Sequence, residues 1–148
     1  MFRGITNLNL DGKGRLAMPT RHRERFARND GQMVVTIDMY ERCLLVYPLD
    51  TWLEIEEAVD RLPSFNRMAN RLRRMLVGHA TDLTLDAAGR VLIPSELRAY
   101  AGLEKSAVLM GQGKKLELWD QAHWDEVRQE IMHEDEGAMP PEMESLSL

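Results

Sequence analysis

Two short segments of related sequence carry the side chains that are best suited to bind an anion. The first is DGKGR at residues 11–15, and the second is DAAGR at residues 86–90. In the first segment, Lys13 and Arg15 present two cations close together. Arginine can bind guanine or a phosphate through two parallel hydrogen bonds, whereas lysine acts as a point charge. Because a two-stranded ribbon fits the major groove of DNA, two such cations on a turn between strands favour contact with nucleic acid.

The other residues of both segments are typical of a tight turn. Asp11 and Asp86 can accept hydrogen bonds from the backbone amides that follow them, and Gly14 and Gly89 can adopt a positive φ. These four residues are the predicted turn-forming residues. Each aspartate could also pair with the arginine that ends its segment, so Arg15 is open to a structural role as well as a binding role.

The two turns belong to a longer internal repeat. Residues 8–27 align with residues 83–102, and seven of the twenty aligned pairs are identical, where chance gives about one. The identical pairs are Leu8/Leu83, Leu10/Leu85, Asp11/Asp86, Gly14/Gly89, Arg15/Arg90, Pro19/Pro94 and Arg23/Arg98. Alternating apolar residues before each turn and β-prone runs after it predict strand, turn, strand, short helix, strand, turn, strand and helix in each half.

Each half contains two further predicted strands and a second helix. These strands are expected at residues 33–37, 44–47, 107–110 and 116–119. Trp52 and Trp124 each open an amphipathic segment, and Asp50 and Asp120 are the predicted caps of these two helices. Gly102 is the predicted end of the short helix in the second half.

A segment without a counterpart in the repeat lies between the halves. Pro63 and Ser64 begin a predicted helix that ends at Gly78, and its apolar residues share one face. These residues are Phe65, Met68, Leu72, Met75 and Leu76. The sequence therefore divides into a first repeat at 1–60, a helical insertion at 61–78, a second repeat at 79–132, and an acidic tail at 133–148 that is expected to be mobile.

Charge is unevenly distributed along the chain. The net charge is −5, yet residues 1–30 carry seven basic and three acidic residues, and residues 61–79 carry five arginines and no acid. From residue 117 onward, ten acidic residues accompany Arg128 alone. Phosphate binding depends on clustered cations, so the basic front is compatible with DNA despite the acidic total. The arginines of the insertion are expected either to form a solvated helix face or to meet an acidic face of a neighbouring subunit.

The paired segments DGKGRLAMP and DAAGRVLIP, in a chain that starts MFRG, resemble the MraZ family of bacterial proteins with two tandem SpoVT-AbrB domains. The resemblance covers residues 1 to about 130. It implies a mixed α+β fold, mainly β, in which two AbrB-like repeats interleave as a swapped-hairpin β-barrel. It also implies a ring-shaped homo-oligomer that binds double-stranded promoter DNA in the cytoplasm, on the nucleoid. There it regulates, as a repressor, the division and cell-wall gene cluster that includes its own gene.

By the same resemblance, the DNA-binding residues are Lys13 and Arg15 in the first turn, Arg90 in the second, and Arg3 from the N-terminal strand. The second turn departs from the first, because it carries two alanines where the first has Gly12 and Lys13. We therefore expect the first turn to dominate DNA contact and the second mainly to complete the fold. For Arg90, a structural role is favoured over DNA contact.

Other classes of protein receive less support from the sequence. The four histidines lack ligand spacing with cysteine or carboxylates, no serine lies in a nucleophile elbow, and DGKGR lacks the frame of a P-loop, so an enzyme is not expected. The single cysteine, Cys43, cannot form an intrachain disulfide. No cofactor, metal, small-molecule substrate or membrane segment is expected. The open alternatives are an antitoxin-like interaction module that binds a partner through its acidic tail, and a nonspecific nucleoid binder.

Overall fold

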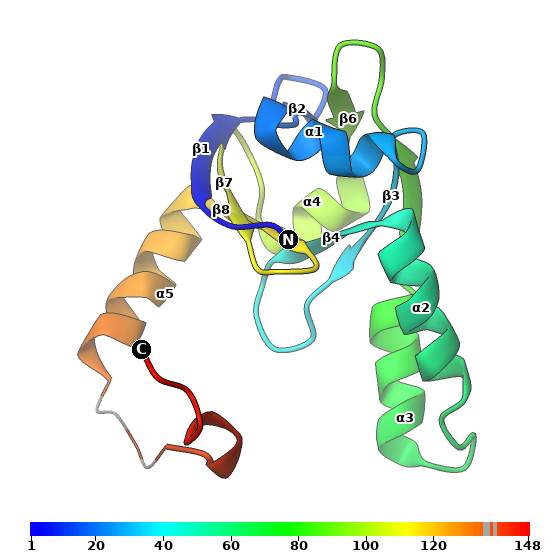
Figure 1. The fold of residues 1–148 in the computed structure, drawn as a ribbon. Coiled ribbons are helices and arrows are strands. Elements are labelled where there is room, and N and C mark those ends of the chain that lie inside the picture. The colour runs from blue at the N-terminus through cyan, green and yellow to red at the C-terminus, as the bar shows by residue number, and fades with distance from the viewer. Residues whose placement is uncertain (135–136, 138) are drawn as a thin grey trace.

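The structure is a computed structural model that describes residues 1–134, 137 and 139–148, so part of the predicted tail (135–136 and 138) lies outside the described residues. The elements confirm the order predicted for each repeat (Figure 1). The first repeat contains β1 (Ile5–Asn9), β2 (Arg15–Ala17), α1 (Thr20–Ala27), β3 (Gln32–Ile37), β4 (Leu44–Pro48) and α2 (Leu49–Asp60). The second contains β5 (Thr81–Thr84), β6 (Arg90–Leu92), α4 (Ser95–Ala101), β7 (Ser106–Gly111), β8 (Leu116–Asp120) and α5 (Gln121–His133). Helix α3 (Arg67–Leu72) and the π-helical turn η1 (Arg73–Val77) lie between them, and the 3-10 turn η2 (Pro141–Met143) follows α5.

The strands of the two repeats are interleaved in one antiparallel sheet. Its order is β1-β7-β8-β4-β3-β5, so each repeat supplies an edge strand that pairs with the other repeat. Strand β1 pairs with β7 from Ile5↔Met110 to Asn9↔Ser106, and β5 pairs with β3 in the same antiparallel way. Strands β4 and β8 meet at the centre. The repeats therefore cannot be separated without breaking paired strands.

The expected closure of the strands into a barrel is wrong for this chain. In the described part of the chain, the six-stranded sheet stays open, because its edge strands β1 and β5 do not pair with each other. After each turn the chain leaves the sheet, and β2 pairs with β6 as a separate two-stranded ribbon. The mixed α+β class and the exchange of strands between repeats are confirmed.

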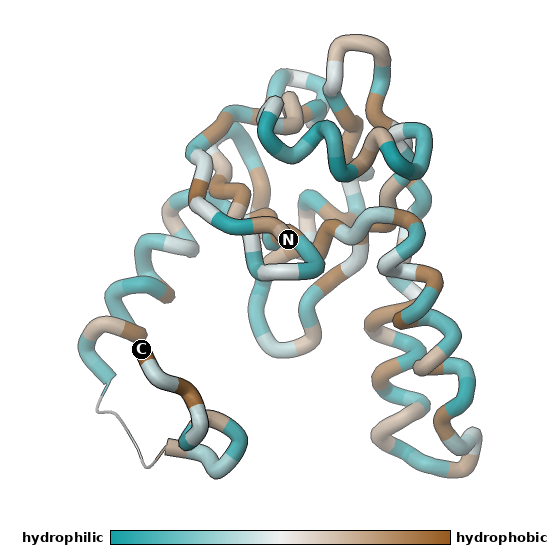
Figure 2. Tube along the Cα trace, in the orientation of Figure 1, coloured by the Kyte–Doolittle hydropathy of each residue, from teal (hydrophilic) through white to brown (hydrophobic). Residues whose placement is uncertain are grey.

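The ribbon covers the core that the open sheet leaves accessible. Leu16 of β2 and Val91 of β6 are paired in the ribbon and are 1% and 2% exposed. They belong to a cluster that draws on both repeats and includes Phe26 from α1 and Leu97 from α4. Figure 2 shows α1 as a mainly hydrophilic helix, and the fully buried Phe26 anchors it to this core. Burial of apolar side chains from both repeats in one cluster thus stabilises the interleaved arrangement.

Two predicted helix ends, at Asp120 and Gly102, are confirmed, and a third, at Asp50, is wrong. Asp120 caps α5 by accepting a hydrogen bond from the backbone N–H of His123 at 3.1 Å. Gly102 ends α4 with a φ of 66°. Asp50 is not the cap of α2, because Pro48 occupies the N-cap position and Asp50 lies in the first turn of the helix.

The helix between the repeats begins later than predicted and is only partly covered. Asn66 caps α3 by accepting a hydrogen bond from the N–H of Ala69 at 3.0 Å. Phe65 therefore precedes the helix and is 91% exposed, and Met68 is also exposed. Leu76, in contrast, packs against the apolar cluster beneath α2. The predicted apolar face is thus divided between a partly buried end in η1 and an exposed end in α3.

The turns and the longer helices lie at different ends of the molecule. In Figure 1 the turns between β1 and β2 and between β5 and β6 are at the top. Helices α2 and α3 extend downward on one side of the sheet, and α5 extends downward on the other side. The turns are therefore free of the longer helices.

Separating the two repeats tests the interleaved core. We expect a fragment of residues 1–78 to lack a stable folded monomer, because β1 loses β7 and β2 loses β6. Mixing it with a fragment of residues 79–148 is expected to restore near-ultraviolet circular dichroism and a 1:1 complex in size-exclusion chromatography. A fragment of residues 1–78 that unfolds cooperatively as a monomer contradicts this account.

Candidate nucleic-acid interface

The first turn, residues 11–15, is built around the carboxylate of Asp11. Its Oδ1 accepts hydrogen bonds from the backbone N–H groups of Lys13 and Arg15, at 3.0 and 2.9 Å. Its Oδ2 accepts a hydrogen bond from Nε of Arg15 at 2.7 Å. Gly14 closes the turn with a φ of 89°. The carboxylate thus fixes both the backbone of the turn and the base of the Arg15 guanidinium.

The second turn, residues 86–90, has the same backbone but a looser arginine. Oδ1 of Asp86 accepts hydrogen bonds from the N–H groups of Ala88 and Arg90, both at 2.9 Å. Nε of Arg90, however, lies 3.5 Å from Oδ2 of Asp86, which is beyond a normal hydrogen bond. Gly89 has a φ of 75°. The two turns therefore share a scaffold and differ in charge and in how firmly the arginine is held.

The electrostatics of the two aspartates follow from these contacts. The backbone N–H and the guanidinium of Arg15 lower the pKa of Asp11 from its ordinary value of 3.8 to about 2. The backbone N–H of Arg90 is the main cause that lowers the pKa of Asp86, and the charges of Arg90 and Arg15 contribute. Both carboxylates are therefore ionised at neutral pH. Arg15 is close enough to the second turn to influence its carboxylate.

The ribbon brings the two arginines onto one outer surface. In the β2–β6 register, Arg15 is opposite Leu92 and Ala17 is opposite Arg90. Paired residues share a face, and Leu16 and its partner occupy the buried face. Arg15 and Arg90 are thus diagonal neighbours on the outer face, typically about 7–8 Å apart between Cα atoms. Lys13 precedes Arg15 in the same turn, so the structure gathers these three cations.

Arg3 lies away from this group. It precedes β1, whereas Lys13 and Arg15 follow it, so the length of the strand separates them. Its neighbour Gly4 is close to the guanidinium of Arg21, which donates a hydrogen bond to Thr6. Arg3 therefore belongs with the cations of α1 at the opposite end of β1.

The glycine of each turn also packs against an arginine of the other repeat. A Cβ on Gly14 would lie 2.5 Å from Nε of Arg98, and one on Gly89 would lie 2.4 Å from Cζ of Arg23. Nε of Arg23 donates to the carbonyl of Met18 at 2.7 Å, and Nε of Arg98 makes the equivalent bond to the residue before Pro94 at 2.9 Å. Each turn glycine therefore packs directly against a guanidinium. A side chain in place of the glycine would collide with that guanidinium.

The role of this arginine pair was missed from sequence, although a signal was present. Arg23 and Arg98 are one of the seven identical pairs of the repeat. Their spacing from the turns gave no indication that each arginine crosses to the opposite repeat. The exchange also involves the backbone, because the N–H of Met18 donates to the carbonyl of Gly89 and that of Ile93 to the carbonyl of Gly14, at 2.9 and 3.0 Å.

Other groups that could carry chemistry are engaged within the protein. Among the described residues, one group of potential metal ligands, Asp38, Cys43 and Glu117, has its ligand atoms within 4.8 Å of one another. Glu117 accepts hydrogen bonds from Gln112 and Trp119, both at 3.0 Å. Burial raises the pKa of the Cys43 thiol and favours its neutral form. This arrangement packs polar groups together without presenting a free thiolate.

No helix in the described ranges is both long enough and apolar enough to cross a lipid bilayer.

Known proteins share the repeated sequence over its whole length. The chain matches the family model of MraZ protein, described as antitoxin-like, over residues 1–75 and again over residues 76–143. The chain belongs to the MraZ family. Curated relatives from Halorhodospira halophila and Thioalkalivibrio sulfidiphilus are 51% identical over 152 residues and 52% identical over 151 residues, with complete coverage of both chains. One from Coxiella burnetii is 47% identical over 152 residues with the same coverage. All three are named Transcriptional regulator MraZ.

The two MraZ matches meet between residues 75 and 76, inside η1. Each match therefore contains one turn, one strand of the ribbon and one of the crossing arginines. The family model thus supports two equivalent units in sequence, while the structure adds that their strands are exchanged.

Gly14→Ala tests the crossing of the repeats at the first turn. We expect the free energy of unfolding to fall by about 1–3 kcal/mol, because alanine is strained at positive φ and its Cβ would meet the Arg98 guanidinium. Gly12→Ala is the matched control, since Gly12 has open space around its Cα and the second turn already carries Ala87 there. Urea unfolding measures both variants. Equal effects contradict the role given to Arg98.

The ionised Asp11 gives the first turn a defined acid dependence. Its pKa is lower in the folded chain than its ordinary value of 3.8, so its stabilising contribution is present above that value and is lost as pH falls toward about 2. Carboxyl-detected NMR titration is expected to place the Asp11 midpoint near 2. Asp11→Asn is expected to differ from the parent in stability at pH 5 and to converge with it at the acid end. A midpoint near 4 contradicts the contacts described.

Proposed function

We propose that this chain is a sequence-specific DNA-binding transcriptional regulator that contacts promoter DNA mainly through its first turn. The observation that carries this proposal is the placement of Lys13 and Arg15 on a turn whose backbone is fixed by Asp11. The names of the MraZ relatives support regulation of transcription. A rigid, positively charged turn at the end of a two-stranded ribbon has the size and chemistry to enter a DNA groove.

Arg15 combines a structural contact with free donors. Asp11 engages Nε, and within the described residues no hydrogen bond engages the terminal Nη atoms of Arg15. Those atoms can bind guanine or a phosphate while the salt bridge holds the direction of the guanidinium. Lys13 adds a point charge with its backbone already ordered. Holding the side chain in advance reduces the entropy lost on binding.

Arg90 and Arg3 have secondary roles in this proposal. Arg90 shares the outer face of the ribbon with Arg15 and reaches phosphates beside the first turn, but its own turn carries no lysine. Arg3 contributes positive charge from the far end of β1. The turn-forming residues Asp11, Gly14, Asp86 and Gly89 position these cations without binding DNA.

Several copies of the chain act together in the proposed mechanism. One turn makes few contacts and binds weakly, whereas a ring of identical subunits can engage several short promoter repeats at once. We propose a repressor of the division and cell-wall gene cluster that includes its own gene, acting in the cytoplasm on the nucleoid. In this proposal the chain consists of a first repeat at 1–60, an insertion at 61–78, a second repeat at 79–132 and a tail at 133–148. No catalytic step or cofactor is part of this mechanism.

Fluorescence anisotropy with DNA from upstream of the chain's own gene tests the proposal. We expect binding that prefers this DNA over a scrambled duplex at low and physiological salt. Arg15→Ala is expected to weaken it about 10- to 100-fold, because a bidentate contact is lost. Arg90→Ala is expected to have a smaller effect. Arg61→Ala removes an equal charge at the end of α2, in an exposed pair with Glu57, and serves as the matched control.

The remaining outcomes separate the alternatives. Equal losses for Arg15→Ala and Arg90→Ala contradict the dominance of the first turn. Salt-sensitive binding without preference for the promoter favours a nonspecific nucleoid binder. Absence of binding by the parent at either salt concentration favours the antitoxin-like function that the family description suggests, with the acidic tail as the partner surface.

A further inference from the structure

The side chains of Asp38, Cys43 and Glu117 use only part of their capacity to bind other groups. Oδ1 of Asp38 accepts hydrogen bonds from the N–H groups of Tyr40 and Glu41, at 2.8 and 3.1 Å. Both hydrogen bonds to the side chain of Glu117 go to its Oε1. Within the described residues, no hydrogen bond engages Oδ2 of Asp38, Oε2 of Glu117 or the Cys43 thiol. Each side chain therefore keeps one atom that can serve as a ligand.

The backbone brings these three side chains together. The N–H of Asp38 donates to the carbonyl of Cys43 at 3.1 Å and closes the loop between β3 and β4. Leu45 is opposite Glu117 in the pairing of β4 with β8, and Cys43 precedes Leu45 by two residues. Alternation along a strand places Cys43 and Glu117 on the same face of the sheet. The fold thus positions the group with two side chains from the first repeat and one from the second.

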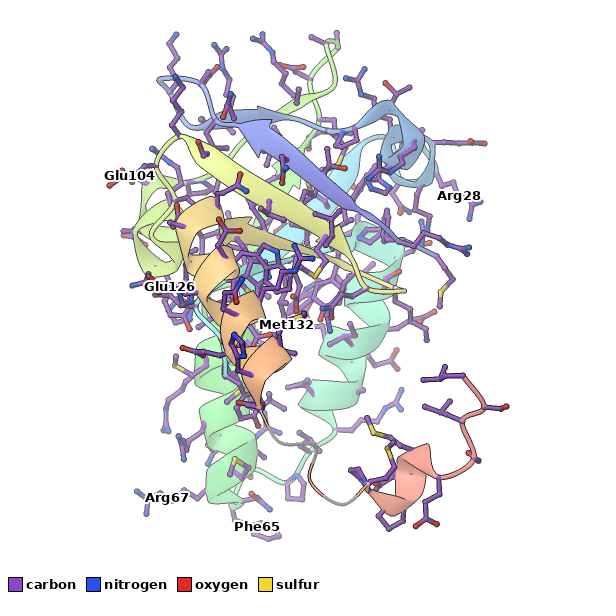
Figure 3. All side chains as sticks on the ribbon, turned by 90° about the vertical axis from the view of Figure 1, so that its left-hand side faces the viewer. Arg28, Phe65, Arg67, Glu104, Glu126 and Met132 are labelled. Carbon is purple, nitrogen blue, oxygen red and sulfur yellow. The ribbon has the colours of Figure 1, made fainter. Side chains whose placement is uncertain are left out.

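The group is buried and has no positive partner. Cys43 is 0% exposed and Glu117 is 7% exposed. Cys43 packs with Trp119 and Val108 on the face of β7 and β8 that α5 covers, and Figure 3 shows α5 in front of this face. In the part of the chain that the structure describes, neither carboxylate forms a salt bridge with a lysine, arginine or histidine. Because a buried carboxylate without a counter-charge is costly, a bound cation would stabilise this group.

The types of the three ligand atoms favour one cation. Zinc binds cysteine sulfur together with carboxylate oxygen, whereas magnesium and calcium bind oxygen alone. Ligand atoms around a tetrahedral zinc ion, with bonds of about 2.0–2.3 Å, are about 3–4 Å apart. The three ligand atoms here all lie within 4.8 Å of one another, so the group needs only a slight contraction to surround the ion. Asp38 is partly exposed and gives the ion access from solvent.

We propose that Asp38, Cys43 and Glu117 form a zinc site, with a water molecule as the fourth ligand. The thiol of Cys43 binds as the thiolate, and its proton passes to solvent as the metal enters. The site is independent of the DNA-binding function.

Zinc bound here joins the two repeats at a second place. Asp38 and Cys43 flank the loop between β3 and β4, and Glu117 belongs to β8. Figure 1 shows this loop at the lower edge of the sheet, whereas the turns are at the top. An ion that binds the folded chain but not the unfolded chain raises stability by mass action. The metal therefore supports the interleaved fold from the end opposite the crossing arginines.

Cobalt and zinc titrations of the full-length, metal-free chain without an affinity tag test the site. Co²⁺ is expected to produce a sulfur-to-cobalt charge-transfer band in the near ultraviolet, because Cys43 binds as a thiolate. Competition between the protein and a colorimetric chelator is expected to show one bound Zn²⁺ per chain. Zn²⁺ is also expected to raise the urea midpoint of unfolding, whereas Mg²⁺ at the same concentration leaves it unchanged.

Three variants assign the ligands. Cys43→Ala and Asp38→Asn are each expected to weaken zinc binding by at least about 10-fold, since even the loss of an outer partner of a metal ligand costs about 10- to 100-fold. Asp38→Asn retains an oxygen for the two loop N–H groups, so its effect is separate from folding. Glu41→Gln is the matched control, because it removes an exposed carboxylate of the same loop that is outside the group.

The outcomes decide the proposal. All variants keep the four histidines, so binding by histidine alone is the same in each of them. Equal zinc affinity of the parent, Cys43→Ala and Asp38→Asn overturns the site and indicates adventitious binding. A parent without the charge-transfer band, or a Glu41→Gln variant as weak as Asp38→Asn, also overturns it. Loss of the band in Cys43→Ala, with weakened binding in Asp38→Asn and parent-like binding in Glu41→Gln, establishes it.

Discussion

The exchange of two backbone hydrogen bonds between the repeats is the constraint on which the rest of the structure depends. The carbonyls of Gly14 and Gly89 each accept the N–H of a residue that follows the ribbon strand of the opposite repeat. This exchange fixes the register of β2 against β6, and the ribbon in turn covers the shared core. The same two glycines also form the turns. They therefore position the outward-facing cations and, at the same time, hold the ribbon over the buried core. A glycine is required there, since an arginine packs directly on it.

Local features of the fold could be predicted from the sequence, whereas the partners of the strands could not. Alternation and turn residues give the order of elements because they depend on neighbours in the chain. Whether β2 pairs with β6 or completes a barrel depends on contacts between residues far apart in sequence. Asp50 was predicted as a cap from its residue type, but Pro48 already fixes the start of α2. Phe65 was placed on a helical face that begins only after Asn66.

The candidate site shows the same division. The carboxylate that holds each turn could be predicted, because Asp11 and Asp86 contact amides two and four residues ahead. The crossing of Arg23 and Arg98 required the three-dimensional structure, since repetition shows that a residue recurs but does not show which repeat it contacts. Arg3 and Lys13 are close in sequence, but β1 runs between them and places them at opposite ends of the strand. Their separation therefore also required the structure.

Covalent connection of the interleaved repeats has a consequence for the protein at low abundance. In a fold whose halves belong to separate molecules, dilution favours dissociation and unfolding, because stability depends on the concentration of the chains. Here the exchanged strands are parts of one polypeptide. The integrity of each turn is therefore insensitive to the number of molecules in the cell.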